Sequence, residues 1–143
     1  MKQATMDDLF LNIDQTVEIK AAPGDVFEGL IEHMCNLEGE EGKPPLKLKL
    51  ERWPGGRWFR DLGNGNGHLW GHVQAIKAPA LLEITGPLWM SFAVASNVQY
   101  RLKEDNGVTL ITLKHSALGL FPDGYRTPAP ELGHRIVLFY LTA

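Results

Sequence analysis

The sequence predicts an α+β fold, in which a helix near the start of the chain packs on a curved antiparallel sheet. Three observations support this prediction. One early segment shows the 3.6-residue period of an amphipathic helix. Most later segments alternate apolar and polar residues, with the period of two that is typical of strands. The connections between these strand candidates have hairpin length, whereas a parallel sheet would need long crossovers.

The first two elements are a strand and a helix. Apolar and polar residues alternate from Leu9 onward, which predicts a first strand that is strongest over Gln15–Lys20. A helix is expected over Pro23–Leu37, because proline suits the first helical position and Asp25 complements the helix dipole. Its apolar residues form one stripe that should face the sheet: Val26, Phe27, Leu30, Ile31 and Met34.

About six antiparallel strands are expected after the helix. Asparagine and glycine tolerate positive φ, so "LGNGNG" and "EDNG" predict tight hairpin turns between strands. The strands are expected over Leu46–Glu51, Arg57–Asp61, His68–Lys77, Leu81–Gly86, Phe92–Lys103 and Val108–Ser116.

The last element, Glu131–Leu141, is open to two interpretations. It could be a closing helix, or a strand, because "RIVLFYL" is rich in β-branched and aromatic residues. One helix cannot cover a six-stranded sheet, so we expect a last helix or a partner to cover the rest of the concave face. An exposed "IVLFYL" would be unusually apolar, so we expect it to be buried in the core or in a homodimer.

Composition indicates a single domain over residues 1–143 and excludes several classes of partner. The formal net charge is −3, so no overall positive field attracts nucleic acid or anionic lipid. No apolar run approaches the roughly 20 residues that span a bilayer. Two acidic residues lie where a signal peptide would be basic and apolar. The single cysteine, Cys35, agrees with a reducing compartment and is expected to be a small buried hydrophobe. We therefore expect a cytoplasmic protein.

Two motifs suggest a cofactor or a metal, and neither interpretation is favoured. "GNGNG" lacks the third glycine of a dinucleotide-binding loop, because Trp70 stands at that position and a strand follows. His68 and His72 would lie about 13 Å apart on a strand, at ~3.3 Å per residue, too far to share one metal ion. His68, Trp70 and His72 are instead expected to form one stripe opposite Leu69, Gly71 and Val73. No cofactor or metal is expected.

Aromatic residues gather on the predicted sheet, where they either fill the core or line an apolar binding site. His115 ends an apolar alternation on the expected inner face. It is either a partner for a bound polar group or a structural histidine bonded to a backbone carbonyl. No catalytic triad order, Cys-x-x-Cys motif or clear carboxylate pair is evident, so no catalytic residue is assigned.

The order of several motifs resembles the SRPBCC/START-like helix-grip superfamily, which includes the Bet v 1-like proteins. The nearest likeness is to the branch named for the activator of Hsp90 ATPase. Four motifs carry the resemblance: Ala22-Pro23 with Val26-Phe27, Gly55-Gly56-Arg57-Trp58, Gly71 and Val73 followed by Pro79, and Thr109 and Thr112 followed by His115. The resemblance covers roughly residues 15–120. It implies a sheet gripping a long C-terminal helix, with a hydrophobic cavity between them. The helix expected here is short, and the family's Gly-Trp pair is missing.

Three functions remain open. The leading hypothesis is non-catalytic binding of a small hydrophobic molecule, lipid-like or polyketide-like. The cavity would be lined by Trp58, Trp70, Trp89, Tyr100, Ile111, Leu113 and His115. The second is a module that stimulates a chaperone ATPase through Lys47, Lys49 and Arg52. The third is a cyclase or hydrolase of the same fold that uses His115 or an unrecognised carboxylate in the cavity.

Overall fold

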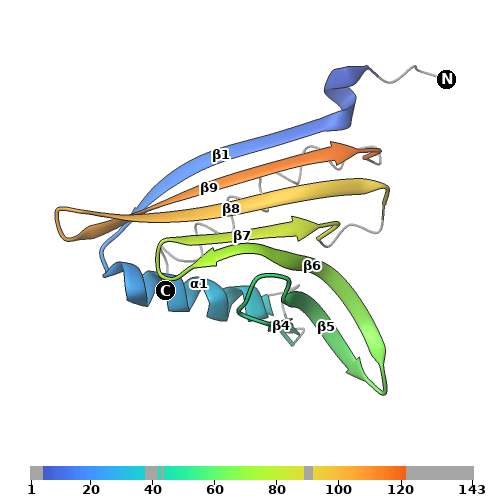
Figure 1. The fold of residues 1–143 in the computed structure, drawn as a ribbon, viewed down its shortest axis with the longest axis horizontal. Helices are drawn as coiled ribbons and strands as arrows, with labels where there is room; N and C mark the ends of the chain where they lie inside the picture. Colours follow the sequence, from blue (N-terminus) through green and yellow to red (C-terminus); the bar gives the residue numbers. More distant parts are fainter. Residues whose placement is uncertain (1–4, 38–41, 43, 89–91, 122–143) are drawn as a thin grey trace.

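The structure, a computed structural model, describes residues 5–37, 42, 44–88 and 92–121 (Figure 1). Within these residues, seven strands form one antiparallel sheet in the order β1-β9-β8-β7-β6-β5-β4, and β2 and β3 form a small ribbon. The elements are η1 (Met6–Leu9), β1 (Phe10–Ile19), α1 (Pro23–Cys35), β2 (Asn36–Leu37), β3 (Leu46–Lys47), β4 (Lys49–Leu50), β5 (Arg57–Gly63), β6 (Asn66–Lys77), β7 (Leu81–Gly86), β8 (Val94–Asp105) and β9 (Val108–Gly119). The predicted α+β architecture is confirmed, and the expected element at Glu131–Leu141 lies outside the described residues.

The end of the helix and the strand after it differ from the prediction. α1 ends at Cys35, two residues early, because Asn36 and Leu37 leave the helix to pair with β3. The predicted single strand Leu46–Glu51 is two short strands. Leu48, between them, is buried, and its N–H donates to the carbonyl oxygen of Cys35 at 2.8 Å. The leucines alternate with lysines as predicted. The strand is nevertheless interrupted at Leu48, which bonds to the end of α1, so that β3 pairs with β2 and β4 pairs with β5.

Both predicted hairpin turns are confirmed. Asn64 and Gly65 join β5 to β6 with φ of 55° and 76°. Asn106 and Gly107 join β8 to β9 with φ of 50° and 83°. Positive φ at both central residues gives a turn whose twist matches that of the flanking strands.

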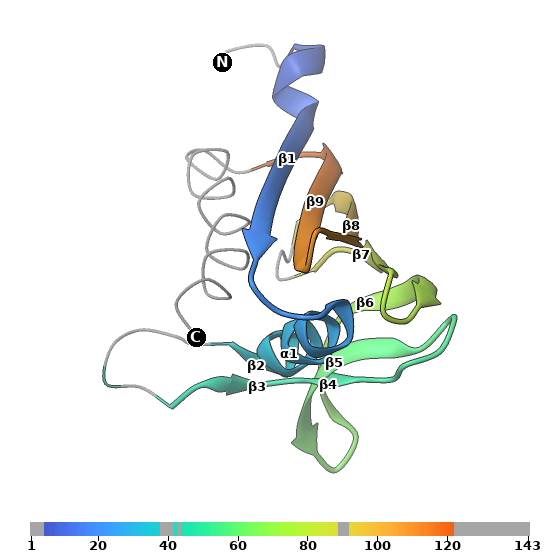
Figure 2. The same cartoon turned by 90° about the vertical axis from the view of Figure 1, so that its left-hand side faces the viewer.

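The sheet curves strongly around α1 (Figure 2). One cause is a bulge in β6, where Trp58 faces Gly71 but Phe59 faces Leu69, which leaves Trp70 as an extra residue. The bulge turns Trp70 toward the core and leaves Leu69 exposed. The predicted stripe of His68, Trp70 and His72 is therefore wrong, because strict alternation fails at a bulge.

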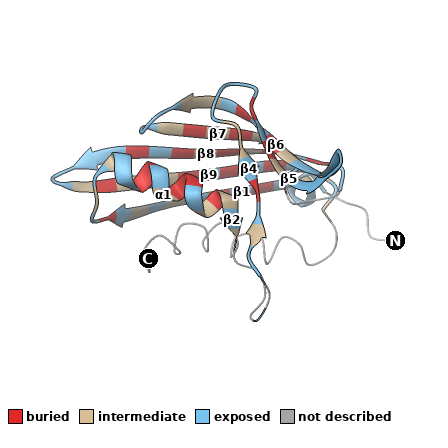
Figure 3. Cartoon of the chain, turned by 90° about the horizontal axis from the view of Figure 1, so that it is seen from below, coloured by how far each residue is buried: buried red, intermediate tan, exposed pale blue. Residues whose placement is uncertain are grey.

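The core lies between α1 and the inner face of the sheet, which we define as the face that α1 packs against. The buried residues of α1 are the five predicted from its apolar stripe. Figure 3 shows that α1 covers the part of the sheet nearest the β8–β9 hairpin. The helix-side cluster contains these α1 residues together with Val98, Tyr100, Ile111 and Leu113. A distal cluster, farther along the strands, contains Leu11, Ile13, Val94 and Ala117.

None of the helices in the described part of the chain could span a bilayer.

Candidate functional site

Three polar side chains lie on adjacent strands of the inner face. His115 on β9 is opposite Ile13 on β1 and Val98 on β8. Gln15 and Ser96 are each two residues away from these partners, so both are diagonal neighbours of His115. Diagonal neighbours on a sheet lie about 7 Å apart, within reach of long side chains. We call Gln15, His115 and Ser96 the polar diagonal.

The polar diagonal separates the two apolar clusters of the core. Along its own strand, each member has an apolar residue two positions away in either direction. One of these residues belongs to the helix-side cluster or packs against it, and the other belongs to the distal cluster. These neighbours are Val98 and Val94 beside Ser96, Leu113 and Ala117 beside His115, and Val17 and Ile13 beside Gln15. The inner face is therefore apolar at both ends and polar across its middle.

His115 is held in its neutral form. Its side chain is 2% exposed, and burial lowers its pKa from 6.5 to about 4. Burial acts in this direction because a charged imidazolium loses its hydration in an apolar environment. A neutral imidazole has one nitrogen that donates and one that accepts a hydrogen bond. His115 therefore adds a polar group to the inner face without adding a charge at neutral pH.

Ser96 is the second buried member of the polar diagonal. It is 6% exposed, and its hydroxyl oxygen has no hydrogen-bond partner among the residues that the structure describes. A buried hydroxyl left without a partner costs about 1–3 kcal/mol. Native proteins contain few such groups, and each calls for an explanation, for example a bound water molecule or a function.

Five of the predicted site residues besides His115 are described, and all face the core. Tyr100 and Leu113 are directly opposite each other, and Ile111 is two residues along β9 from Leu113. These three residues pack in the helix-side cluster beneath α1. Burial raises the pKa of the Tyr100 hydroxyl, which stays protonated.

Trp58 and Trp70 form a separate aromatic pair on β5 and β6. Their ring centroids are 5.2 Å apart and the ring planes meet at 70°, an edge-to-face arrangement. Trp58 is buried and Trp70 is half-buried. The register places Trp58 opposite Gly71, on the same face as the polar diagonal. Trp89, the remaining predicted residue, lies outside the described residues.

Sequence reasoning missed Ser96 and Gln15. The signal for Ser96 was present, because it occupies an inward position in the alternation Val94-Ser96-Val98-Tyr100. Gln15 similarly continues the inward series of Leu11 and Ile13. Neither residue type suggests chemistry alone. Their significance depends on the register of β1, β8 and β9, which the sequence pattern does not define.

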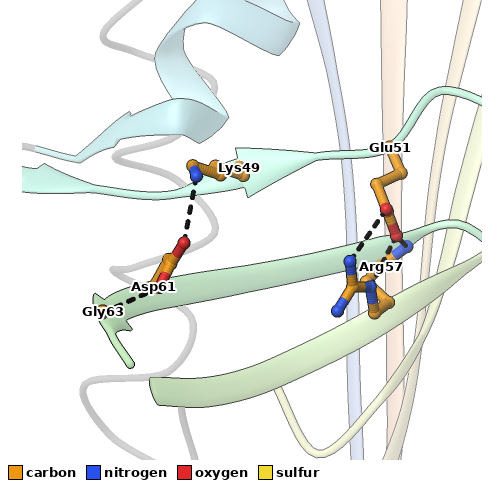
Figure 4. A network of polar contacts seen from close by, with 5 residues as sticks. All are labelled: Lys49, Glu51, Arg57, Asp61 and Gly63. Carbon is orange, nitrogen blue, oxygen red and sulfur yellow. Dashed lines mark hydrogen bonds and ion pairs between the residues drawn. The ribbon is translucent and has the colours of Figure 1, made fainter. Parts of the chain in front are cut away.

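The basic residues predicted to contact a chaperone are mostly held in ion pairs. The guanidinium of Arg52 donates two hydrogen bonds to the carboxylate of Glu28, each at 2.8 Å. Lys49 Nζ lies 3.0 Å from a carboxylate oxygen of Asp61 (Figure 4). Lys47 is exposed. The charges of Arg52 and Lys49 are therefore offset by neighbours within the chain.

No group of three or more His, Cys, Asp or Glu side chains in the described part of the chain could hold a metal ion. Cys35 is half-buried against the helix-side cluster. Burial raises the pKa of its thiol, which disfavours the reactive thiolate.

Comparison with known proteins identifies the architecture. No family model and no curated protein sequence matches the chain. Solved structures do match it. CalU16 from Micromonospora echinospora has a TM-score of 0.62 at 16% identity, over 91% of this chain and 75% of that one. The Aha1 dimer from Colwellia psychrerythraea has a TM-score of 0.57 at 14% identity, over 92% of each chain. The chain has the helix-grip fold.

A third solved structure also matches the chain. The di-domain ARO/CYC protein StfQ from the steffimycin biosynthetic pathway has a TM-score of 0.58 at 11% identity. The match covers 96% of this chain and 48% of StfQ. Identities this low establish the helix-grip fold alone, and the predicted resemblance is confirmed at that level. Function has to be argued from the site.

Proposed function

We propose that the protein binds a small hydrophobic molecule on the inner face of its sheet, without catalysis. The observation that carries this proposal is the polar diagonal, a narrow polar band between two apolar clusters. Ligand sites of this kind have apolar walls and a few polar groups that fix the orientation of the ligand. Trp58, Trp70, Tyr100, Leu113 and His115 would contribute to the site. Ile111, which packs beneath α1, would support these residues from behind. Trp89 is proposed to line the same site.

Two observations favour binding over the alternative functions. General acid–base catalysis is most efficient when the pKa of the catalytic group is close to the working pH, and that of His115 is about 4. The chaperone hypothesis relied on three basic side chains, and two of them are paired within the chain. A cyclase, a hydrolase or an ATPase activator is therefore less well supported than a binding protein.

A titration with naphthalene, followed by tryptophan fluorescence, tests the proposal. We expect saturable binding that Ala117→Leu weakens by about tenfold, because the larger side chain would take up space on the inner face where the distal cluster meets the polar diagonal. Ala95→Leu is the matched control. Ala95 is exposed on the neighbouring strand, so this variant should bind naphthalene like the unmodified protein. An absence of saturable binding up to the solubility of naphthalene would contradict the proposal.

A further inference from the structure

Four small residues cross the inner face in one line, one on each of four neighbouring strands. Ala117 on β9 is opposite Ser96 on β8, and Ser96 is opposite Gly86 on β7. Gly86 in turn lies against Gly71 on β6, because a Cβ built on Gly86 would lie 2.7 Å from the Cα of Gly71. We call Gly71, Gly86, Ser96 and Ala117 the small-residue row.

Larger residues bound the small-residue row at both ends. Trp58 is opposite Gly71, and Leu11 is opposite Ala117. The two glycines are required by the backbone, since a Cβ on Gly71 would lie 2.7 Å from the carbonyl oxygen of Thr85. β6 and β7 therefore present only backbone along this line. The result is a flat strip without large side chains. It runs across the strands from the ring of Trp58 to the side chain of Leu11.

Ser96 provides an independent indication that a ligand occupies this strip. It is the only member of the small-residue row with a polar side chain, and it is more than nine-tenths buried. Its hydroxyl has no hydrogen-bond partner in the described part of the chain. A hydroxyl can donate one hydrogen bond and accept others, so it suits an alcohol, a phenol or a carbonyl group.

We propose that Ser96 is the hydrogen-bonding anchor of the ligand, and that the ligand lies across the strands along the small-residue row. This inference rests on the proposed binding function and specifies the chemical class of the ligand. A flat apolar ring system fits the strip because only backbone and small side chains form its floor. One hydroxyl or carbonyl oxygen on that ring system fits Ser96, with His115 on the adjacent strand as a second polar neighbour.

The test compares 2-naphthol with naphthalene, two flat probes that differ by one hydroxyl group. We expect the unmodified protein to prefer 2-naphthol, and Ser96→Ala to reduce its affinity for 2-naphthol by about fivefold, the effect of losing one neutral hydrogen bond. Affinity for naphthalene should not fall. Ser116→Ala is the matched control, because Ser116 is the next residue to His115 on β9 and is exposed on the opposite face.

The outcomes separate this inference from the proposed function. If neither probe binds, both fail. If both probes bind and Ser96→Ala leaves the preference for 2-naphthol unchanged, the binding function stands and the anchor role of Ser96 is overturned. Circular dichroism of each variant checks that it is folded. Ala117→Leu should weaken both probes alike, which distinguishes loss of space from loss of a hydrogen bond.

Discussion

The indole nitrogen of Trp58 donates a hydrogen bond to the backbone carbonyl oxygen of Met34, at a donor–acceptor distance of 3.1 Å. Carbonyl groups in the last turn of a helix have no partner within the helix. Trp58 supplies the missing donor from β5, and this residue is itself only 4% exposed. This bond joins the end of α1 to the curved side of the sheet, where the aromatic pair lies.

Replacing Trp58 tests this link. Trp58→Phe keeps an aromatic ring but leaves the Met34 carbonyl without its donor and removes buried volume. We expect the free energy of unfolding to fall by about 2–3 kcal/mol, measured by urea denaturation. Trp53→Phe is the control, because Trp53 is 56% exposed and its replacement should change stability little. Equal effects of the two substitutions would show that the bond to Met34 contributes nothing.

The buried His115 should make stability depend on pH. Its pKa is about 4 in the folded protein and about 6.5 in the unfolded chain. Above pH 6.5 both states are neutral, so the group has no effect. As the pH falls from 6.5 toward 4, the unfolded chain binds a proton that the folded protein does not, so stability decreases. The total loss should be about 3 kcal/mol.

The measurement for His115 is urea denaturation at several pH values between 7 and 4. His115→Gln should flatten the curve in this window, even if it lowers stability overall. His72→Gln is the control, since His72 is exposed. A curve for His115→Gln that falls as steeply as that of the unmodified protein would contradict the burial argument.

Glu51 should make stability fall in the same direction with pH, but in a lower pH window. Arg57 donates to its carboxylate through the backbone N–H and two guanidinium nitrogens, at 2.7–2.9 Å (Figure 4). These bonds lower the pKa of Glu51 to about 2. A lowered carboxyl pKa stabilises the folded state above the ordinary value near 4.5, and this contribution disappears as the pH falls toward 2.

Glu51→Gln should therefore lower the urea midpoint at pH 7, and the difference from the unmodified protein should shrink below pH 4.5. Glu104→Gln serves as the comparison, because Glu104 is an exposed carboxylate near the β8–β9 turn. A difference for Glu51→Gln that is constant from pH 7 to pH 3 would mean that the carboxylate charge is not involved.

Two glycines should respond in opposite directions to alanine. Gly86 has φ of 145°, and an added Cβ would meet the backbone of Gly71 and Trp70 at 2.7 and 2.9 Å. We expect Gly86→Ala to reduce the free energy of unfolding by about 2–4 kcal/mol. Gly24 lies in the first turn of α1 with open space around it, so Gly24→Ala should raise stability by up to about 1 kcal/mol. Thermal melts of both variants would show this contrast, and a neutral Gly86→Ala would contradict the close approach of β6 and β7.

The sequence pattern was most informative where a local rule decides the structure. The apolar stripe of α1 and the two Asn-Gly turns were predicted correctly, because each depends on neighbouring residues. Prediction failed at the break around Leu48 and at the bulge at Trp70. Both depend on contacts with another element, α1 in one case and β5 in the other, which the alternation within a single segment does not reveal.

The candidate site was less predictable than the fold for the same reason. Large aromatic and aliphatic residues mark a core from their composition alone, and His115 stands out because it ends an apolar alternation. Ser96 and Gln15 acquire their roles only when β1, β9 and β8 lie side by side. A serine within a strand has no distinctive sequence signature, and its hydroxyl becomes significant only once its neighbours are known.

The pairing of β1 with β9 has a consequence for biosynthesis. Phe10 is opposite Leu118, and Ile19 is opposite Thr109. A growing chain exposes the first strand long before its partner has been made, since nearly the whole described sequence separates Phe10 from Leu118. Contacts between such distant residues slow folding, and unpaired apolar strands promote aggregation. The nascent protein thus depends on its last described strand to protect its first.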